Sequence, residues 1–135
     1  VEDIAEAVVG SVPGAKFGLA FSEASGECLI RIDGNDEDLM ALSRDNAKVI
    51  GAGHSFILFL RDCYPINLLN AIKNLPEVCT IYCATANAAE VVIAESLLGR
   101  GIMGVIDGQK PQGVEGPDGV RLRISLLRRF GYKRG

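Results

Sequence analysis

The chain has few side chains that carry metal or nucleophilic chemistry. It contains a single histidine, so a reaction that depends on an imidazole can take place at only one position, His54. Its four cysteines show no paired spacing, and Cys79 and Cys83, four apart on an expected strand, would lie about 13 Å apart. A zinc site built from Cys and His is therefore not expected. A disulfide framework is unnecessary in a chain with this much apolar sequence, so we expect a reducing, cytoplasmic environment.

Signals of several other protein classes are also missing. No apolar run reaches the ~18 residues that a bilayer crossing needs, so we expect no membrane span. The net charge of −3 argues against nucleic-acid binding over the whole surface, because that attraction needs Lys and Arg to neutralise phosphates. The sequence still allows a local basic patch that binds nucleic acid. The sequence lacks a G-x-x-x-x-G-K-[ST] loop, so the usual phosphate-binding loop of ATPases is absent.

Sequence patterns predict regular structure along most of the chain. Helices are expected at residues 2–9, 36–50, 65–74 and 120–130, and strands at residues 16–22, 28–33, 55–60, 78–84, 90–96 and 101–106. The strand at 55–60 is apolar on both faces, which indicates a central strand covered on both sides. The last three strands indicate an antiparallel meander. The final helix is expected to bury Leu122, Ile124 and Leu127.

This order of elements predicts an α+β fold. Helices are interleaved with strands early in the chain, whereas the late strands are consecutive, and this does not fit a doubly wound Rossmann domain. We expect a single-domain sandwich over residues 1–135, with helices packed on a mixed, largely antiparallel sheet. The chain opens at Val1 without a methionine, which leaves room for an upstream segment.

One glycine-rich motif matches a nucleotide-binding pattern only by its letters. Residues 99–104 read G-x-G-x-x-G, but a dinucleotide site needs this motif to follow a strand and to open a helix. Here the motif leads into a strand. The glycines therefore indicate a turn and a bulge.

The segment Gly51-Ala52-Gly53-His54 is more informative. Two glycines around one alanine let the backbone bend sharply just before an apolar strand, so the histidine is delivered to a crevice. His54 can be a hydrogen-bonded histidine at a strand end. It can also be a nucleophile, in which one ring nitrogen is fixed by a partner and the other attacks a phosphoryl group.

Other polar groups have both a structural and a functional interpretation. Asp107 ends the last strand before a glycine, where a carboxylate can line a site or simply belong to a turn. Ser25 and Gly26 belong to a hairpin turn that could also offer donors to an anion. Asn70 lies in an amide stripe on the helix 65–74, and Thr85 and Asn87 lie at a strand end. Amides suit a purine edge, although such a stripe is often only the wet side of a helix.

These motifs together resemble the adenosine-specific kinase family of archaea and some bacteria. The resemblance runs over essentially the whole chain, and the segments that carry it are residues 1–7, 17–26, 51–56, 64–67, 69–74, 84–87, 99–101 and 104–108. Members of the family usually have an additional segment before the first helix of this chain. Such a segment would contribute a further strand.

The resemblance implies a phosphotransferase. In that family the histidine that corresponds to His54 carries a phosphoryl group beside a pocket for adenosine or AMP. The implied phosphoryl donor is ATP, with Mg²⁺, and the implied assembly is a homo-oligomer, a trimer or a hexamer. On this interpretation Asp107 is a metal or histidine partner. Ser25 and Gly26 are phosphate contacts, and the nucleoside contacts are Asn70, Thr85 and Asn87.

Two other functions stay open. The protein can be a non-catalytic sensor of adenosine or AMP that is switched by phosphorylation of His54. It can also be a scaffold or RNA-binding protein that acts through its C-terminal arginines, because the last 17 residues carry six basic side chains and no acidic one.

Overall fold

The computed structural model describes residues 1–135. The helices are α1 (Glu2–Ser11), α2 (Glu37–Ile50), the 3₁₀ turn η1 (Pro65–Asn67), α3 (Leu69–Lys73) and α4 (Pro117–Arg129). The strands are β1 (Lys16–Ser22), β2 (Ile30–Gly34), β3 (Ser55–Arg61), β4 (Ala89–Glu95) and β5 (Arg100–Asp107). The predicted α+β class is confirmed. None of the helices combines the length and the apolar character that crossing a membrane requires.

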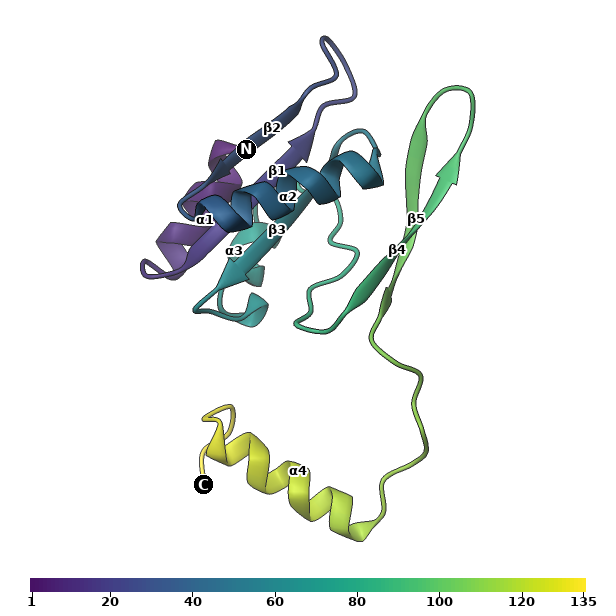
Figure 1. The fold of residues 1–135 in the computed structure, drawn as a ribbon. Coiled ribbons are helices and arrows are strands. Elements are labelled where there is room, and N and C mark those ends of the chain that lie inside the picture. The colour runs from purple at the N-terminus through teal and green to yellow at the C-terminus, as the bar shows by residue number, and fades with distance from the viewer.

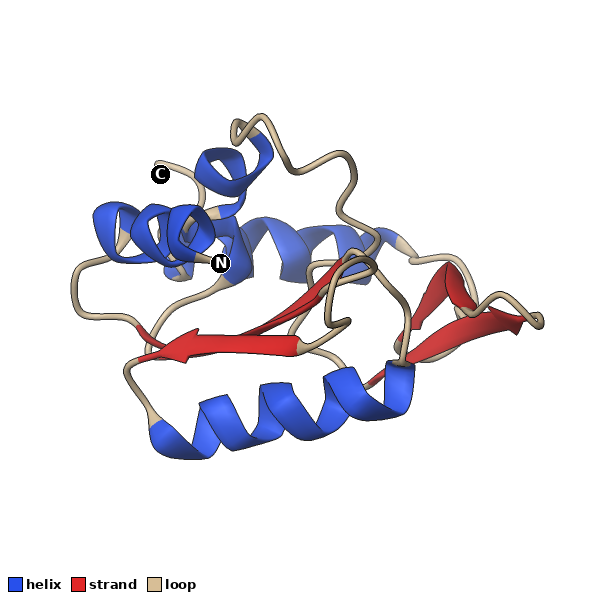
Figure 2. Ribbon diagram, turned by 90° about the horizontal axis from the view of Figure 1, so that it is seen from above, coloured by secondary structure: helices blue, strands red, loops and turns tan.

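Strand β1 is the centre of the main sheet. The strand order is β2-β1-β3, and both pairings are antiparallel (Figure 1). Helices cover both faces of this sheet (Figure 2). Phe17 and Leu19 join the core formed with α1 and α3, and Gly18 between them lies against α2. The buried core residues are Ile4, Ala5, Val8, Ala15, Phe17, Leu19, Leu68 and Ile72.

Helix α2 packs directly on the backbone of β1. A Cβ atom at Gly18 would lie 2.1 Å from the carbonyl carbon of Leu39, so only glycine fits there. Next to this contact the buried Ser43 hydroxyl donates a 2.6 Å hydrogen bond to the Gly18 carbonyl. The helix begins as predicted, since the Asp36 carboxylate accepts from the Leu39 N–H. It ends at Gly51, whose φ of 61° is left-handed.

The prediction of a central strand at 55–60 is wrong. Strand β3 pairs only with β1 and forms one edge of the sheet, and its side chains are half-buried rather than buried. The sequence at β1 is less apolar, yet β1 has partners on both sides. The strand predicted at 78–84 is absent, because no other strand lies beside it to accept a ladder of hydrogen bonds.

The late part of the chain therefore forms a hairpin rather than a three-stranded meander. Strands β4 and β5 make a separate antiparallel sheet, with a bulge between Val92 and Ile93. All pairings in both sheets are antiparallel, without the parallel pair that a mixed sheet would include. At the tip of the hairpin Leu97 and Leu98 are fully exposed.

Two of the predicted helices also differ from the structure. The helix expected at 65–74 is broken at Leu68, whose φ of −133° separates η1 from α3. Helix α4 forms, but it stands away from the rest of the chain and has no buried residue (Figure 1). The expected burial of Leu122, Ile124 and Leu127 is wrong, because these side chains are 61%, 40% and 36% exposed.

The contact at Gly18 gives a test of how α2 is held. Gly18→Ala should destabilise the protein by at least about 2 kcal/mol, because the added methyl group meets helix backbone that cannot move aside. Gly10→Ala is the matched control, since space around Gly10 in α1 is open and alanine favours the helix by about 0.5–1 kcal/mol. Urea unfolding of both variants measures the difference. Equal stability of the two variants would show that α2 does not press on β1.

Candidate functional site

The loop between α2 and β3 carries His54 to the end of the central strand. Gly51 ends the helix, Ala52 is buried, and the Ser55 hydroxyl donates to the Ala52 carbonyl at 2.6 Å. His54 directly precedes β3, as the sequence predicted. The loop is therefore short and fixed at both ends.

The backbone of His54 has an uncommon conformation. Its φ of 51° is left-handed, which costs a residue with a side chain roughly 1 kcal/mol or more. The His54 N–H donates a 2.7 Å hydrogen bond to the carbonyl of Ser22, the last residue of β1. The imidazole stacks on Phe21, with ring centroids 6.1 Å apart and an angle of 13° between the planes. These two contacts hold the strained residue in place, and strain of this kind is concentrated at functional sites.

The imidazole itself makes no hydrogen bond. The residue is exposed, and none of the hydrogen bonds or ion pairs of the structure includes a ring nitrogen of His54. Within this chain, the hydrogen bond that His54 makes at the strand end therefore comes from its backbone N–H and not from the ring. The partner that was expected to fix one ring nitrogen is not found either. Both nitrogens are free to meet a ligand.

The turn between β1 and β2 lies against the His54 loop. A Cβ atom at Gly53 would lie 2.6 Å from the Cβ of Ala24, so loop and turn are in close contact at this point. Ser25 and Gly26 follow directly, and both are exposed. Gly26 has a φ of 60°, and the Ser25 carbonyl accepts from the Cys28 N–H, so these residues form a turn as expected. The structure thus brings two predicted phosphate contacts close to the His54 loop.

An ion pair borders the same region. The Arg31 guanidinium donates to both carboxylate oxygens of Glu23, at 2.9 and 3.2 Å. This hydrogen bond is the main cause that holds the pKa of Glu23 below its usual range. Burial opposes the shift, and the nearby charge of His54 adds the smallest lowering. Glu23 therefore remains ionised beside the histidine over the physiological pH range.

Three other predicted residues gather at the base of the β4–β5 hairpin. The Asn87 side-chain amide donates to the Asp107 carboxylate at 3.1 Å, and the Asn87 N–H donates to the Thr85 hydroxyl at 3.0 Å. Asp107 and Asn87 also line an open hollow of about 410 Å³ together with Ala88, Gly108 and Gln109. Thr85, Asn87 and Asp107 therefore form one cluster.

The structure does not join all the predicted residues into one site. No hydrogen bond or ion pair connects the Asp107 cluster to His54. Asn70 lies on α3, is exposed, and makes no side-chain hydrogen bond to either group. Its neighbour Asn67 has a structural use, since its side chain accepts from the Tyr64 N–H at the start of η1.

No group of three or more His, Cys, Asp or Glu side chains converges to hold a metal ion. Near the predicted site residues, the groups that suit Mg²⁺ are the Asp107 carboxylate, the Asn87 amide oxygen and the Glu23 carboxylate, which is already paired with Arg31. Magnesium usually binds one or two protein carboxylates together with substrate phosphates. The donor set therefore suits Mg²⁺ that arrives on a nucleotide and does not suit a resident ion.

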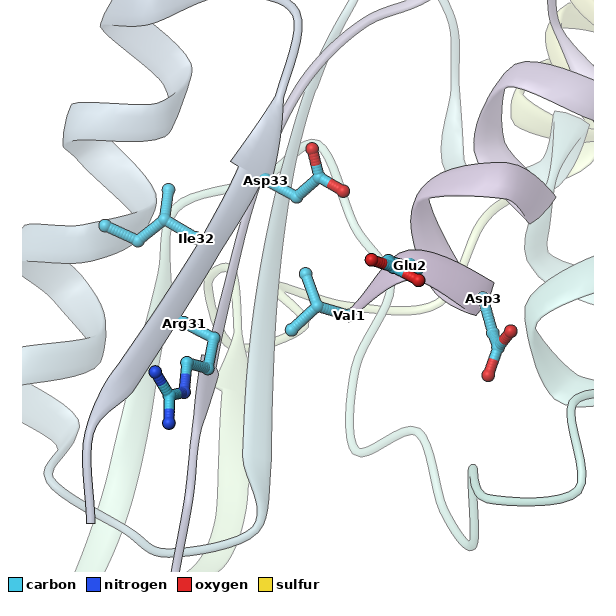
Figure 3. A pocket seen from close by; sticks show the side chains of 6 residues that line it. All are labelled: Val1, Glu2, Asp3, Arg31, Ile32 and Asp33. Atoms are coloured by element: carbon cyan, nitrogen blue, oxygen red, sulfur yellow. The ribbon is translucent and has the colours of Figure 1, made fainter. Parts of the chain in front are cut away.

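A second open hollow of about 450 Å³ lies between α1 and β2 (Figure 3). Its lining consists of Val1, Glu2, Asp3, Arg31, Ile32 and Asp33. It contains none of the predicted site residues and no nucleophile. We therefore place the candidate site at His54 rather than in this hollow.

Sequence reasoning missed Phe21 and Glu23 as neighbours of His54, and Arg31 as the partner of Glu23. The pair Glu23–Arg31 could have been found, since opposite charges on the two arms of a predicted hairpin can pair diagonally; Arg31 itself is directly opposite Phe21. The stacking of Phe21 on His54 depends on the pairing of β1 with β3, which the sequence did not indicate.

The comparisons agree with the resemblance found in the sequence. The family model described as adenosine specific kinase matches residues 1–133. Among solved structures, the crystal structure of the PH1918 protein from Pyrococcus horikoshii OT3 has 44% sequence identity and a TM-score of 0.95. The match covers 100% of this chain and 83% of the PH1918 chain. No curated protein sequence gives a significant match.

The reactivity of the Cys83 thiol should depend on the charge of Asp107. Burial is the first cause that raises the pKa of Cys83, and the charge of Asp107 raises it further. A raised pKa leaves less thiolate at a given pH, so Cys83 should react with iodoacetamide several-fold more slowly than the exposed Cys28 at pH 8.

Asp107→Asn removes that charge and should therefore accelerate alkylation of Cys83. Cys63 is the internal control, because burial and Asp62 raise its pKa and Asp107 does not. Peptide mass spectrometry after timed alkylation measures both rates. An unchanged alkylation rate of Cys83 in Asp107→Asn would show that the charge of Asp107 does not influence this thiol.

Proposed function

The chain belongs to the adenosine specific kinase family, and we propose that it is a phosphotransferase that acts through a phosphohistidine at His54. In this proposal His54 takes a phosphoryl group from ATP and adenosine binds nearby as the acceptor. The observation that carries the proposal is the exposed imidazole of His54. It has no hydrogen-bond partner and is held on a left-handed backbone by Phe21 and the Ser22 carbonyl.

The proposed reaction has two steps. A lone pair of the neutral imidazole attacks the terminal phosphorus of ATP, an N–P bond forms, the P–O bond to the leaving group breaks, and ADP departs. A ribose hydroxyl of adenosine then attacks the same phosphorus, the N–P bond breaks, and AMP is released while the hydroxyl proton passes to the freed imidazole. A phosphohistidine is a high-energy N–P species, so the second step runs downhill if water is excluded.

The other predicted residues keep supporting roles in the proposal. Ser25 and Gly26 would contact phosphate from the turn that touches Gly53. Asp107 would bind Mg²⁺ that enters with the nucleotide, or act as a partner of the histidine. Thr85 and Asn87 would contact the nucleoside, supported by their hydrogen bond within the Asp107 cluster. Asn70 stays a prediction that no contact supports. Free cysteines at all four positions fit the proposed cytoplasmic location.

The first test is intact-mass spectrometry after incubation with ATP and Mg²⁺. The protein should gain one acid-labile phosphoryl group, and His54→Gln should gain none, because no other histidine exists. The melting temperature of His54→Gln should stay within a few degrees of the unsubstituted protein, since the ring is exposed and unbonded. A gain that persists in His54→Gln contradicts the proposal.

Addition of adenosine distinguishes a kinase from a sensor. If the protein is a kinase, adenosine added to the phosphorylated form should discharge it and produce an equal amount of AMP. A phosphorylated form that binds adenosine but never discharges would identify a sensor instead.

We also propose that the chain forms a homo-oligomer, a trimer or a hexamer, in which α4 packs on a second copy. The helix has an apolar stripe at i, i+4 and i+7, formed by Val120, Ile124 and Leu127, and no residue of α4 is buried in its own chain. The high TM-score over the full chain supports the same separated placement of α4 in the PH1918 structure.

The distribution of charge along the chain also favours a second copy as the partner of α4. Residues 119–135 carry six basic side chains and no acidic one, whereas residues 1–118 carry 17 acidic and eight basic side chains. The helix of one copy is therefore complementary in charge to the body of another.

Ile124→Asp should convert the assembly to a chain of 14.4 kDa in sedimentation velocity, because a carboxylate in the apolar stripe cannot be buried without a partner. Ser125→Asp adds the same charge one residue away, outside the stripe, and should leave the assembly intact. If the unsubstituted protein already sediments at 14.4 kDa, the oligomer is excluded and α4 needs another partner.

A further inference from the structure

One side chain connects the β4–β5 hairpin to the rest of the molecule. The Arg100 guanidinium at the start of β5 donates from Nε to the Ile50 carbonyl at 3.0 Å. It also donates from one terminal nitrogen to the Val49 carbonyl at 3.4 Å. Its other terminal nitrogen lies 3.3 Å from the Glu95 carboxylate across the hairpin. No other side-chain hydrogen bond or ion pair joins the hairpin to the helices or the main sheet.

The carbonyls that Arg100 binds are at the C-terminal end of α2. The last carbonyls of a helix have no partner within the helix and carry the negative end of its dipole. A planar guanidinium satisfies two of them at once and brings a complementary positive charge. Figure 1 shows this end of α2 directed toward the hairpin. Arg100 is therefore a cap that is supplied from another part of the chain.

The capped end of α2 leads straight into the His54 loop. Gly51 follows Ile50, and a Cβ atom at Gly51 would lie 3.2 Å from both Cδ and Nε of Arg100. The arginine stem thus covers the left-handed glycine at which the loop departs from the helix. Only three residues separate Ile50 from His54, so a movement of the helix end would be passed on to the imidazole.

From these contacts we infer that Arg100 is a positioning residue for His54. By fixing the end of α2 it holds the loop 51–54 in its strained conformation, and it couples that conformation to the placement of the hairpin. The effect on catalysis rests on the proposed function, whereas the effect on the loop does not. Arg100 touches neither the imidazole nor any reacting group.

Hydrogen exchange of the free protein tests the structural part. Arg100→Gln should increase exchange of the hydrogen-bonded Gly51 and His54 amides of the loop about tenfold, because charge-assisted bonds that hold the loop are lost. The His54 N–H, bonded to Ser22, is the most informative amide. Exchange within the β1–β2 pairing should not change. Arg100→Lys keeps the positive charge but lacks the planar guanidinium that binds two carbonyls at once, so it should retain only part of the protection from exchange.

Glu95→Gln is the matched control. It removes the ion pair on the exposed side of Arg100 and leaves both carbonyl contacts in place, so loop exchange should equal that of the unsubstituted protein. The inference is overturned if Arg100→Gln leaves exchange of the Gly51 and His54 amides unchanged, or if Glu95→Gln raises it as much.

Phosphorylation by ATP provides the second readout. The rate of phosphohistidine formation should fall about tenfold in Arg100→Gln, with folded fraction and adenosine affinity unchanged, because only the nucleophile is misplaced. Guanidinium ion at millimolar concentration should partly restore the rate in Arg100→Ala. If the loop loosens but neither the unsubstituted protein nor any variant is phosphorylated, the proposed function fails and the positioning role stands. Loosening of the loop with full phosphorylation rates would overturn the catalytic part of the inference.

Discussion

The contact between helix α2 and strand β1 at Gly18 is the constraint on which the rest of the structure depends. The helix lies against the strand backbone, where a single methyl group would collide with Leu39, and the buried Ser43 hydroxyl binds the Gly18 carbonyl. This contact fixes the direction of α2 relative to the central strand. The helix and the strand then each end at the same corner of the molecule, and their ends define the candidate site.

The site is built from chain ends rather than from a cavity. The loop after α2 supplies His54, the last residue of β1 accepts its N–H, and the turn after β1 closes against Gly53. The ring stacks on Phe21 but keeps both nitrogens free. The left-handed backbone of His54 is costly to maintain for structure alone. The same arrangement is useful for a nucleophile that must meet a large, charged substrate.

The second half of the chain presents apolar and basic surface that its own fold does not use. The leucines at the hairpin tip and the apolar stripe of α4 are exposed. Arg121 and Arg123 pair with Asp118 and Glu115, whereas the other four basic side chains of residues 119–135 have no ion-pair partner in their own chain. Burial of this surface on another copy would offset the cost of keeping α4 apart. The body of the chain, rich in carboxylates, has the opposite charge. An assembly would therefore bury the apolar stripe of α4 and bring the basic C-terminal segment of one copy to the acidic body of another.

Local patterns in the sequence determined a large part of this description. They gave the α+β class, the cap at Asp36, the end of α2 at Gly51, the hairpin turn at Ser25 and Gly26, and the position of His54 at a strand entrance. Each of these depends on a few consecutive residues, whose conformational preferences act without the rest of the chain. The family motifs are local in the same sense.

Only the tertiary structure decided which elements pair and which remain apart. Sequence could not show that β1 rather than β3 is central, because an apolar run favours burial without specifying hydrogen-bond partners. It predicted a strand at 78–84 that has no neighbour, and buried leucines on a helix that stands alone. The stacking of Phe21 on His54 joins residues 33 positions apart, and the hydrogen bonds from Arg100 to the end of α2 join residues about 50 positions apart. Such contacts depend on how whole elements are arranged, so they become visible only when the chain is folded.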